Sequence, residues 1–420
     1  MLNIFSPPNY QIEVFGSEYI TVRPDIAITD TGPIDFILKD TKEYIDLSET
    51  TLSLEVKVVN ADGTAIVPAT DKDDVAIINN AMHSIFSDVS LYVNGKQVDG
   101  GDDQYHLKAY MSKVFKFSEK TEKGQLFATG FVKDDGYNMD NAKNSAFLKR
   151  KAWTANGAIK KFYGKLHGSM FEQERVLPPG LDLRIKFERA KDALALFSTV
   201  VNAKPRIVIV NAELNILQVK VHPSILQEQL GLLARNVPAM YPLNKIEMHI
   251  ESLKEKTIGD VKGNLFHGKV PKYIIMAMTS TSAFYGDYGK NPFNFKHYNL
   301  ESLHLTRDGE NIMFEKMEFS FKNENVLKEY MSLYQSNNLL GKNSSLPISY
   351  DQFQNGFTHF QWNLSDNRKG MNASPNQTAD LVLRFKFEQP TPEPITMIFY
   401  GIMDSSVLIY GNQMVLVDGI

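Results

Sequence analysis

An eight-residue pattern of alternating apolar and polar residues occurs twice in this chain of 420 residues. The first copy, LDLRIKFE, occupies residues 181–188, and the second, LVLRFKFE, occupies residues 381–388, which is 200 residues later. Alternation of this kind predicts a half-buried strand, and alternation alone makes two strands look alike. A chain that carries such a match across its two halves is nevertheless expected to be a tandem repeat of one β domain.

Two further motifs are also repeated, in the same order, in the two halves of the chain. Residues 108–112 (KAYMS) return as residues 328–332 (KEYMS), 220 residues later. A strand that ends in a tight turn precedes each of them, at Asn94-Gly95 in the first half and at Asp308-Gly309 in the second. Three motifs that are each repeated at a similar spacing indicate a duplication with small insertions. The function is then expected to come from a symmetric building unit rather than from a single pocket.

The composition describes a globular protein, because 43% of the residues are hydrophobic and 22% are charged. The length favours two or three domains. A net charge of −4 argues against a surface that wraps phosphate backbones, so any contact with nucleic acid should be local. The absence of cysteine excludes disulfides and thiolate metal sites. The sequence has neither the pattern of a secretory signal nor an apolar run long enough for a membrane span, and we expect neither.

Strand patterns dominate the chain, and short helical patterns lie between them. Alternation or apolar runs bounded by turns predict strands at residues 52–58, 91–93, 96–98, 206–221, 246–251, 272–278, 381–387 and 395–403. Apolar residues at three- and four-residue spacing predict helices at residues 75–86, 105–115, 223–235 and 326–340. Ser349 with Gln352 predicts a capping box that opens a further short helix. Prolines within residues 222–241 predict a boundary between one domain at 1–222 and a second at 223–420.

Motifs for catalysis or metal binding are missing from the sequence. None of the nine histidines forms a His-x-His pair or a His-Glu-x-x-His motif, and no Gly-x-Ser-x-Gly elbow occurs. Gly95-Lys96 lacks the Walker spacing and is interpreted as a hairpin turn. Asp71, Asp73 and Asp74 lack the glycine and glutamate of an EF-hand and are interpreted as a solvated acidic loop. We therefore predict a protein that is not an enzyme, with no catalytic residues, no cofactor and no metal ligands.

The densest basic segment has two possible meanings. It comprises Lys149, Arg150 and Lys151, followed by Lys160, Lys161 and Lys165. Such a cluster faces DNA or acts as a nuclear signal in some proteins. A solvated face, or an edge strand protected by lysines, is the commoner meaning, and we favour it.

A series of short motifs follows in one order along the chain. They are GPIDF at 32–36, EYIDLS at 43–48, NADGT at 60–64, NNAMHSIFS at 79–87, KRKA at 149–152, FEQER at 171–175, LPPGLDLRI at 177–185 and KNPFNFKHYNL at 290–300. Together they resemble the major capsid proteins of Polinton (Maverick) elements and adintoviruses, from about residue 30 to about residue 400. Virophage capsid proteins share the same architecture and are the group most easily confused with them.

This resemblance implies an all-β fold of two tandem eight-stranded jelly rolls, a double jelly roll, with short helices in the connections. It implies the major capsid protein of a double-stranded DNA virus or a virus-like integrated element, located in the virion capsid. Three chains would form a capsomer of pseudo-hexagonal outline, because two similar barrels in each chain give six roughly equivalent barrels. The implied partners are further copies of the chain, penton and minor capsid proteins, and packaged DNA through weak contacts on the inner face.

Specific segments receive roles within this expectation. Residues 124–144 and 365–378 are predicted to be outer loops, because loops at one end of a capsid barrel vary while the strands hold the shell. Residues 1–25 and 414–420 are predicted to be arms that tie neighbouring chains or bind a minor capsid protein. The differences between the octapeptides, Asp182 against Val382 and Ile185 against Phe385, are expected to mark surfaces that meet different neighbours.

A carbohydrate-binding or carbohydrate-active jelly roll is the alternative function. In that case Trp153 or Trp362 would stack on a sugar, and a pair of carboxylates would serve a glycosidase. The chain has 2 tryptophans, and no carboxylates gather around them in the sequence.

Overall fold

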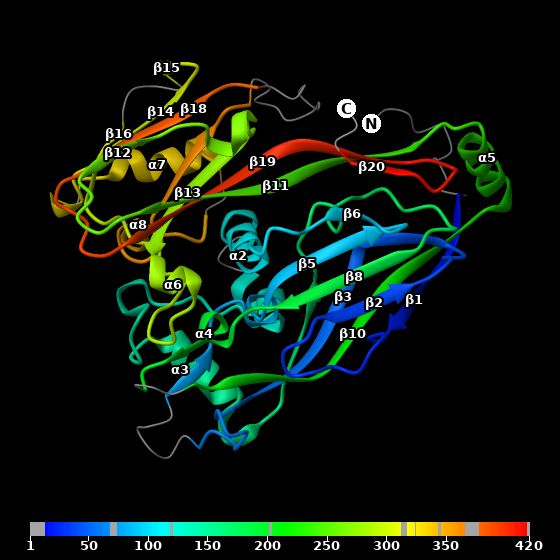
Figure 1. The fold of residues 1–420 in the computed structure, drawn as a ribbon, viewed down its shortest axis with the longest axis horizontal. Helices are drawn as coiled ribbons and strands as arrows, with labels where there is room; N and C mark the ends of the chain where they lie inside the picture. The colour runs from blue at the N-terminus through cyan, green and yellow to red at the C-terminus, as the bar shows by residue number, and fades with distance from the viewer. Residues whose placement is uncertain are drawn as a thin grey trace, which may run out of the picture.

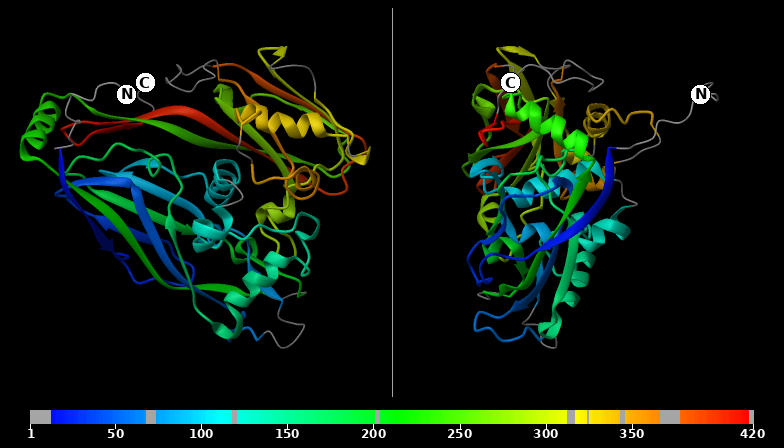
Figure 2. Two further views of the ribbon diagram at one scale, coloured as in Figure 1. Left: turned by 180° about the vertical axis from the view of Figure 1, so that it is seen from behind. Right: turned by 90° about the vertical axis from the view of Figure 1, so that its right-hand side faces the viewer.

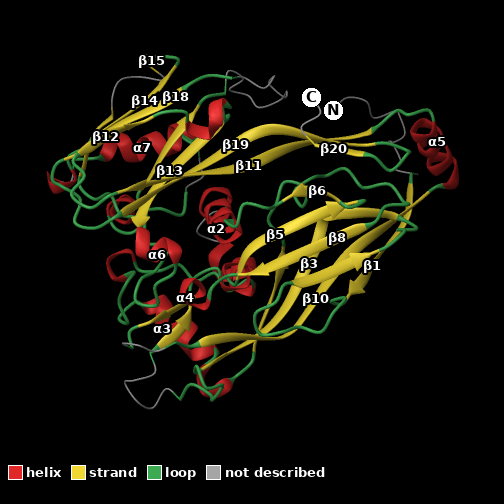
Figure 3. Cartoon of the chain, viewed as in Figure 1, coloured by secondary structure: helices red, strands yellow, loops and turns green. Residues whose placement is uncertain are grey.

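The computed structural model describes residues 13–67, 74–117, 121–200, 204–311, 317–323, 325–342, 346–365 and 378–417. The strands of these residues form four antiparallel sheets of four or five strands and one two-stranded sheet, with short helices between them (Figure 1, Figure 3). Two of the four large sheets come from the first half of the chain, and two come from the second.

The first half contributes eight strands to two four-stranded sheets. One sheet has the order β1 (Val14–Val22), β10 (Arg206–Val221), β3 (Tyr44–Val59) and β7 (Lys160–Lys165). The other has the order β2 (Ile34–Leu38), β8 (Leu183–Arg189), β5 (Phe86–Val93) and β6 (Lys96–Asp99). Buried side chains of both sheets belong to one hydrophobic cluster, as in a sandwich whose inner faces alternate with outward polar residues.

The second half repeats this arrangement. One sheet has the order β11 (Ala239–Leu253), β19 (Ile395–Ile409), β13 (Tyr273–Ser280) and β17 (His359–Asn363), with β20 (Val415–Val417) also paired to β19. The other has the order β12 (Gly259–Lys262), β18 (Leu381–Phe387), β14 (Leu300–Arg307) and β15 (Glu310–Asn311), with β16 (Met317–Glu318) also paired to β14.

The strand order is the same in the two halves. Eight strands of each half form the paths of its two large sheets, which leaves out β4, β9, β16 and β20. When these eight strands are numbered along the chain, one sheet has the order first, eighth, third, sixth, and the other has the order second, seventh, fourth, fifth. Two packed sheets of this order form a jelly roll. The double jelly roll predicted for the chain is therefore confirmed, and so is the duplication behind it.

Helices occupy the connections. They are α1 (Ala81–Ser84), α2 (Tyr105–Lys116), α3 (Ser145–Trp153), α4 (Asp192–Ala195), α5 (Pro223–Ala234), α6 (Thr281–Tyr285), α7 (Leu327–Ser336) and α8 (Tyr350–Gln354). The predicted helices at 105–115, 223–235 and 326–340 correspond to α2, α5 and α7, and the predicted capping box opens α8. The repeated KxYMS motif lies in α2 and in α7, each of which follows the fifth strand of its half.

The predicted helix at residues 75–86 is wrong except for one short turn, because only α1 (Ala81–Ser84) within this range is helical. Val75 to Ile77 form the short strand β4, which pairs with β9 (Leu196–Ser198), and β5 begins at Phe86. Between these strands Asn80 has a φ angle of 59°, a left-handed conformation that interrupts a regular helix. The apolar spacing arose because all three residues of β4 are buried, and a short buried strand has no alternation to distinguish it from a helix.

The hairpins fix how the residues of the two halves correspond. Val93 pairs with Leu183 in the first half, and Arg307 pairs with Leu381 in the second. Both pairs stand next to the hairpin turn, and both ladders contain one bulge at the far end of the pairing. Leu183 therefore corresponds to Leu381, at an offset of 198 residues.

The matched octapeptides, at an offset of 200, are thus out of register with the structure by two residues. A shift of two residues leaves each side chain on the same face of a strand, so the alternation matches in both frames. The sequence comparison identified the right strands and aligned the wrong residues. The expected divergence between Ile185 and Phe385 is wrong, because both side chains are buried in the cores and meet no neighbouring chain. In register, Phe385 corresponds to Phe187.

Hydrogen bonds at the turns support this correspondence. The backbone N–H of Asn94 donates to the carbonyl of Asp182 (2.8 Å), and the N–H of Asp182 donates to Oδ1 of Asn94 (2.9 Å). Asp308 and Asp380 make the same two bonds, both at 2.9 Å. The structural counterpart of Asp182 is therefore Asp380 rather than Val382, and the expected contrast between Asp182 and Val382 is also wrong.

The two hairpin glycines should respond alike to substitution. Gly95 and Gly309 have φ angles of 78° and 83°, and a Cβ added at either position meets nothing within 4 Å. Gly95→Ala and Gly309→Ala are each expected to lower the free energy of unfolding by about 1–2 kcal/mol, from backbone strain alone. Urea unfolding measures this loss. Gly231→Ala in α5, which also has open space but lies inside a helix, should instead stabilise by about 0.5–1 kcal/mol. Unequal losses at the two turns would contradict their equivalence.

The predicted arms are wrong where the structure describes them. Residues 14–22 form β1, which pairs along its length with β10, and residues 415–417 form β20, which pairs with β19. Residues 1–12 and 418–420 lie outside the described residues. The predicted outer loop at residues 365–378 also falls almost wholly outside them.

The two jelly rolls share their hydrophobic cores. One buried cluster combines Tyr110 and Met111 of α2 with the sheets of the second half. The other combines the first-half sheets with Tyr241 of β11 and Val407 of β19. The long strands β11 and β19 reach from the second jelly roll over the first, as Figure 2 also shows from behind. A domain boundary at residues 222/223 stays a prediction, because residues of both halves fill each cluster.

Candidate functional site at the junction of the two jelly rolls

A network of buried polar residues lies between the two jelly rolls. It is built on residues 131–144, here called the junction segment, which run between the first-half strands and the second half. Phe131, Val132, Asp134, Met139 and Asn144 of this segment are buried. The prediction of an exposed outer loop at 124–144 is therefore wrong for these residues. The segment carries polar groups inward because they have partners there.

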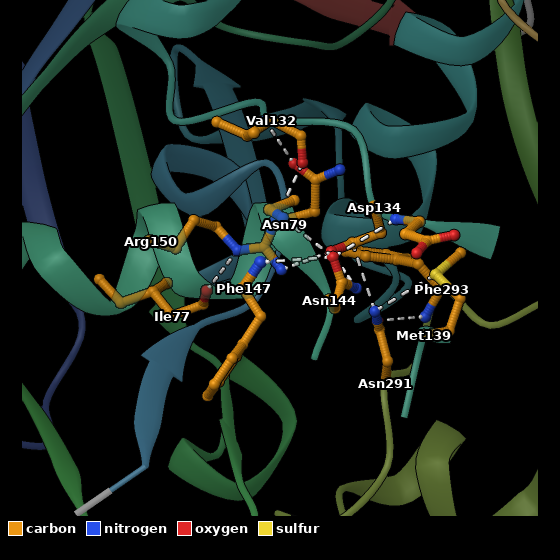
Figure 4. A network of polar contacts seen from close by, with 12 residues as sticks. Ile77, Asn79, Val132, Asp134, Met139, Asn144, Phe147, Arg150, Asn291 and Phe293 are labelled. Carbon is orange, nitrogen blue, oxygen red and sulfur yellow. Dashed lines mark hydrogen bonds and ion pairs between the residues drawn. The ribbon is translucent and has the colours of Figure 1, made fainter. Parts of the chain in front are cut away.

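Arg150 and Asp134 form a buried ion pair at the centre of the junction (Figure 4). Their side chains are 2% and 0% exposed, and Nη2 of Arg150 lies 2.6 Å from Oδ1 of Asp134. Arg150 also donates from Nε to the carbonyl of Ile77 and from Nη1 to the carbonyl of Val132, both at 2.9 Å. The guanidinium thereby joins α3, β4 and the junction segment in one network.

Helix α3 aims Arg150 into this network. Asn144 caps the helix, since its Oδ1 accepts from the N–H groups of Ala146 (3.0 Å) and Phe147 (3.4 Å). The Nδ2 group of Asn144 donates to Oδ1 of Asp134 at 2.9 Å. One asparagine therefore fixes the start of the helix and one oxygen of the buried carboxylate.

The second half closes the network from the other side. Nδ2 of Asn291 donates to Oδ2 of Asp134 at 3.3 Å, across 157 residues of sequence. Asp140 of the junction segment accepts from the N–H of Asn291 (2.8 Å) and from Nδ2 of Asn294 (2.7 Å). The two jelly rolls are thus linked by hydrogen bonds to two carboxylates of the first half.

Aromatic contacts continue the junction beside these polar groups. Tyr110 of α2 stacks on Phe293 with ring centroids 4.0 Å apart and an interplanar angle of 8°. The hydroxyls of Ser112 on α2 and Tyr400 on β19 lie 3.2 Å apart. Helix α2 therefore acts as a wedge, with one side on its own jelly roll and the other on the second.

This arrangement can hold the two jelly rolls in one fixed orientation. A buried charge pair is costly unless its geometry is good and its remaining groups are hydrogen-bonded, and here both conditions are met. Any rotation of one jelly roll against the other would break bonds to Asp134 and Asp140. Within the described ranges, no three His, Asp or Glu side chains gather in a way that could hold a metal ion.

The basic segment is divided between the junction and a sheet edge. Arg150 is buried, so neither the solvated-face interpretation nor a DNA contact holds for it. Lys160, Lys161 and Lys165 lie on β7, the last strand of its sheet, as predicted for an edge strand protected by lysines. Lys161 and Lys165 pair with Glu55 (3.3 Å) and Glu49 (2.7 Å).

Other predicted candidates have structural partners. Lys151 forms an ion pair with Asp74, whereas Asp71 and Asp73 lie outside the described residues. Trp362 is 4% exposed, and Trp153 is covered by Phe162, with ring centroids 5.8 Å apart, and by Lys160. The described structure therefore offers neither tryptophan as a free platform for a sugar.

Sequence reasoning missed the residues that build the junction. Asp134, Asp140 and Asn144 looked like ordinary loop residues, and Asn291 belonged to a motif without an assigned role. The one available signal was the NPFNF run at 291–295, where polar residues alternate with phenylalanines that prove to be fully buried.

An apolar surface lies at the end of the molecule near α5. No residue of α5 is buried, although its sequence PSILQEQLGLLA is largely apolar. Met240, Leu408 and Leu416 stand side by side across β11, β19 and β20, and Met240 and Leu416 are exposed. Exposed apolar surface of this kind is typical of contact regions. None of the described helices is long and apolar enough to cross a membrane.

Comparisons with known proteins identify structures with a similar fold. No family model matches the chain. An uncharacterized protein of Caenorhabditis elegans is 22% identical over 399 residues, covering 92% of this chain and 93% of that protein. A structure of the Sputnik virophage has a TM-score of 0.67 at 11% identity and covers 99% of this chain and 91% of its own.

Two further structures match over nearly the whole chain. The mavirus major capsid protein has a TM-score of 0.57 at 12% identity and covers 99% of this chain and 92% of its own. The Faustovirus major capsid protein has a TM-score of 0.56 at 10% identity, with 97% and 92% covered. Both jelly rolls and the connection between them lie within these matches. The chain therefore has the double jelly-roll fold of these viral major capsid proteins.

Proposed function

We propose that this chain is the major capsid protein of a double-stranded DNA virus or of a virus-like integrated element. The observation that carries the proposal is the same eight-strand order occurring twice in one chain, matched over 97–99% of its length by capsid proteins. A Polinton or adintovirus type is part of the proposal and rests on the order of the sequence motifs.

The duplicated fold supports assembly into a trimer. Three chains with two similar barrels each give six barrels, so a closed three-fold ring acquires a nearly hexagonal outline that can tile a shell. Such tiling needs both barrels of a chain to keep one orientation. The ion pair of Arg150 and Asp134, with the bonds to Asn291 and Asn294, supplies that rigidity.

The proposed role is structural rather than catalytic. Its main partner is a further copy of the chain, first within the trimer and then between capsomers of the virion shell. Penton and minor capsid proteins would complete the shell, and the net charge of −4 fits weak contact with packaged DNA. The carbohydrate alternative is not favoured, because Trp153 and Trp362 both pack against other side chains.

The mass in solution tests the proposal. Light scattering should give three times the chain mass of 47.5 kDa, with little folded monomer. The physical reason is that obligate interfaces bury more than about 2,000 Å² in total, so separated chains would expose a large apolar surface. A stable monomer that binds glycans on an array would contradict the capsid function and favour the alternative.

A further inference from the structure

Four of the nine histidines lie on or next to a single helix, α2, which packs between the two jelly rolls. His83 lies in α1, His106 is on α2 itself, His167 follows β7, and His359 lies on β17 of the second jelly roll. His83, His106 and His359 are buried, and His167 is partly buried. The histidines therefore line both sides of the element that joins the two jelly rolls.

The first-half side of α2 holds a pair of histidines and a lysine. Nδ1 of His83 lies 2.9 Å from the hydroxyl of Tyr105 on α2, and the rings of His83 and His167 are 4.7 Å apart. Nε2 of His83 has no hydrogen-bond partner among the described residues. Lys113 of α2 is buried beside them and donates to Oδ1 of Asn80 (2.6 Å) and to the hydroxyl of Thr129.

The other two histidines also have unused ring nitrogens. Among the described residues, Nδ1 of His106 and Nε2 of His359 have no partner. Nδ1 of His359 lies 2.8 Å from the carbonyl of Phe357, and its ring lies 5.3 Å from that of Phe115 on α2. A proton added to any of these nitrogens would create a buried N–H without an acceptor, next to α2.

The surroundings of these rings disfavour a positive charge. Burial lowers the pKa of His106 and of His359 to about 4, and Asp102 opposes this shift at His106. Burial, followed by the nearby Lys113, holds the pKa values of His83 and His167 well below the usual range. Burial also lowers the pKa of Lys113.

Several other charged groups lie near α2 among the described residues. Lys116 also faces His167, and it forms an ion pair with Glu172. Asp102 pairs with Lys108, and Asp88 and Asp99 face Tyr105. Among the described residues, no carboxylate acts on His83 or His167, so acidification leaves a charge on these rings without a counter-charge from that part of the chain.

We propose that α2 and the four histidines around it form an acid-sensitive joint between the two jelly rolls. Protonation of the rings places unpaired charges on both sides of the wedge. Helix α2 then moves out of its packed position, and Tyr110 and Ser112 lose their contacts with the second jelly roll. The joint is a property of the single chain, so it does not depend on the proposed capsid function.

The direction of the pH effect follows from the neutral folded state. An unfolded histidine takes up a proton near pH 6.5, whereas His106 and His359 in the folded chain resist it down to about pH 4. The stabilising contribution is therefore complete above pH 6.5 and is lost as the pH falls toward 4. As the pH falls through that range, each of these two histidines should raise the unfolding equilibrium constant by up to tenfold for each pH unit.

Unfolding of the full chain between pH 8 and pH 4.5 tests the joint. In the wild type, these two histidines together should raise the unfolding constant by up to 100-fold for each unit that the pH falls. The His106→Gln/His359→Gln double variant should lack this contribution, so its unfolding constant should rise less steeply as the pH falls. The matched control is His304→Gln, at a histidine on β14 whose Nε2 meets Asn311 away from α2. This control should keep the wild-type dependence. Equal dependence in the wild type and the double variant would overturn the proposal.

Hydrogen exchange on the wild-type chain provides a readout that needs no variant. Helix α7 is the counterpart of α2 in the second jelly roll, so it serves as an internal control. At pH 5, after correction for intrinsic exchange, protection of the α2 amides should fall at least tenfold relative to pH 7.5, and that of α7 should fall less. A uniform loss in both helices would show general acid unfolding and would contradict a joint at α2.

Discussion

Replacing Asp134 with asparagine is expected to lower the free energy of unfolding by about 3–5 kcal/mol. The substitution keeps the shape of the side chain but leaves the guanidinium of Arg150 buried without a counter-charge. It also weakens the bonds that Asn144 and Asn291 donate to the carboxylate. Urea unfolding followed by circular dichroism measures the loss.

Two further variants show whether the ion pair itself is responsible. The double variant Asp134→Asn/Arg150→Met should cost less than the sum of the single changes, because it removes both charges together. Glu301→Gln breaks the accessible pair with Lys386 and should cost no more than about 1 kcal/mol. A loss from Asp134→Asn as small as that from Glu301→Gln would contradict the role assigned to the junction.

Replacing Phe293 with alanine is expected to destabilise the chain by about 3–5 kcal/mol and to uncouple the two jelly rolls. The ring is fully buried and stacks on Tyr110, so its removal opens a cavity between α2 and the second jelly roll. Because the two rings no longer stack in this variant, we expect two resolved unfolding transitions in the variant and a single transition in the wild type. Scanning calorimetry counts the transitions.

Phe36→Ala is the matched control for this effect. Phe36 is also fully buried, but it packs against Phe187 inside the first jelly roll, with ring centroids 5.6 Å apart. The Phe36→Ala variant should lose a similar amount of stability and keep a single unfolding transition. If both variants unfold in one transition, Phe293 contributes to the core but does not couple the jelly rolls.

Strands with regular alternation were predictable from the sequence. Residues 206–221 and 381–387 were predicted at the bounds that β10 and β18 have in the structure. The register between the two halves was not predictable, because a period of two residues fits equally well after a shift of two. The pairing of Val93 with Leu183 and of Arg307 with Leu381 decides it, together with the hydrogen bonds at the two turns.

The junction could not be predicted because its partners are distant in the sequence. Asp134 meets Asn291 across 157 residues, and no local pattern signals that contact. Arg150 lies within a Lys-Arg-Lys run, and composition alone assigns such a run to the surface. The exposed Lys161 follows that rule, whereas Arg150 departs from it because α3 turns its side chain toward Asp134.

The family resemblance supplied the architecture that local patterns could not. Alternation and turns indicated strands, yet the pairing of β1 with β10 joins residues near the two ends of the first half. Such non-local pairing has no signature in composition. The predicted N-terminal arm failed for this reason, since residues 14–22 find their partner about 200 residues further along the chain. The predicted C-terminal arm failed for another reason, because residues 415–417 pair locally with residues 407–409 of β19.

Electron microscopy of the purified chain shows whether it builds capsomers of the proposed kind. We expect particles of three-fold symmetry with a nearly hexagonal outline and six similar lobes, two from each chain. The two lobes of one chain should keep a fixed orientation, as the junction at Asp134 and Asn291 requires. Single two-lobed particles, without three-fold assemblies at any protein concentration, would contradict the capsid function.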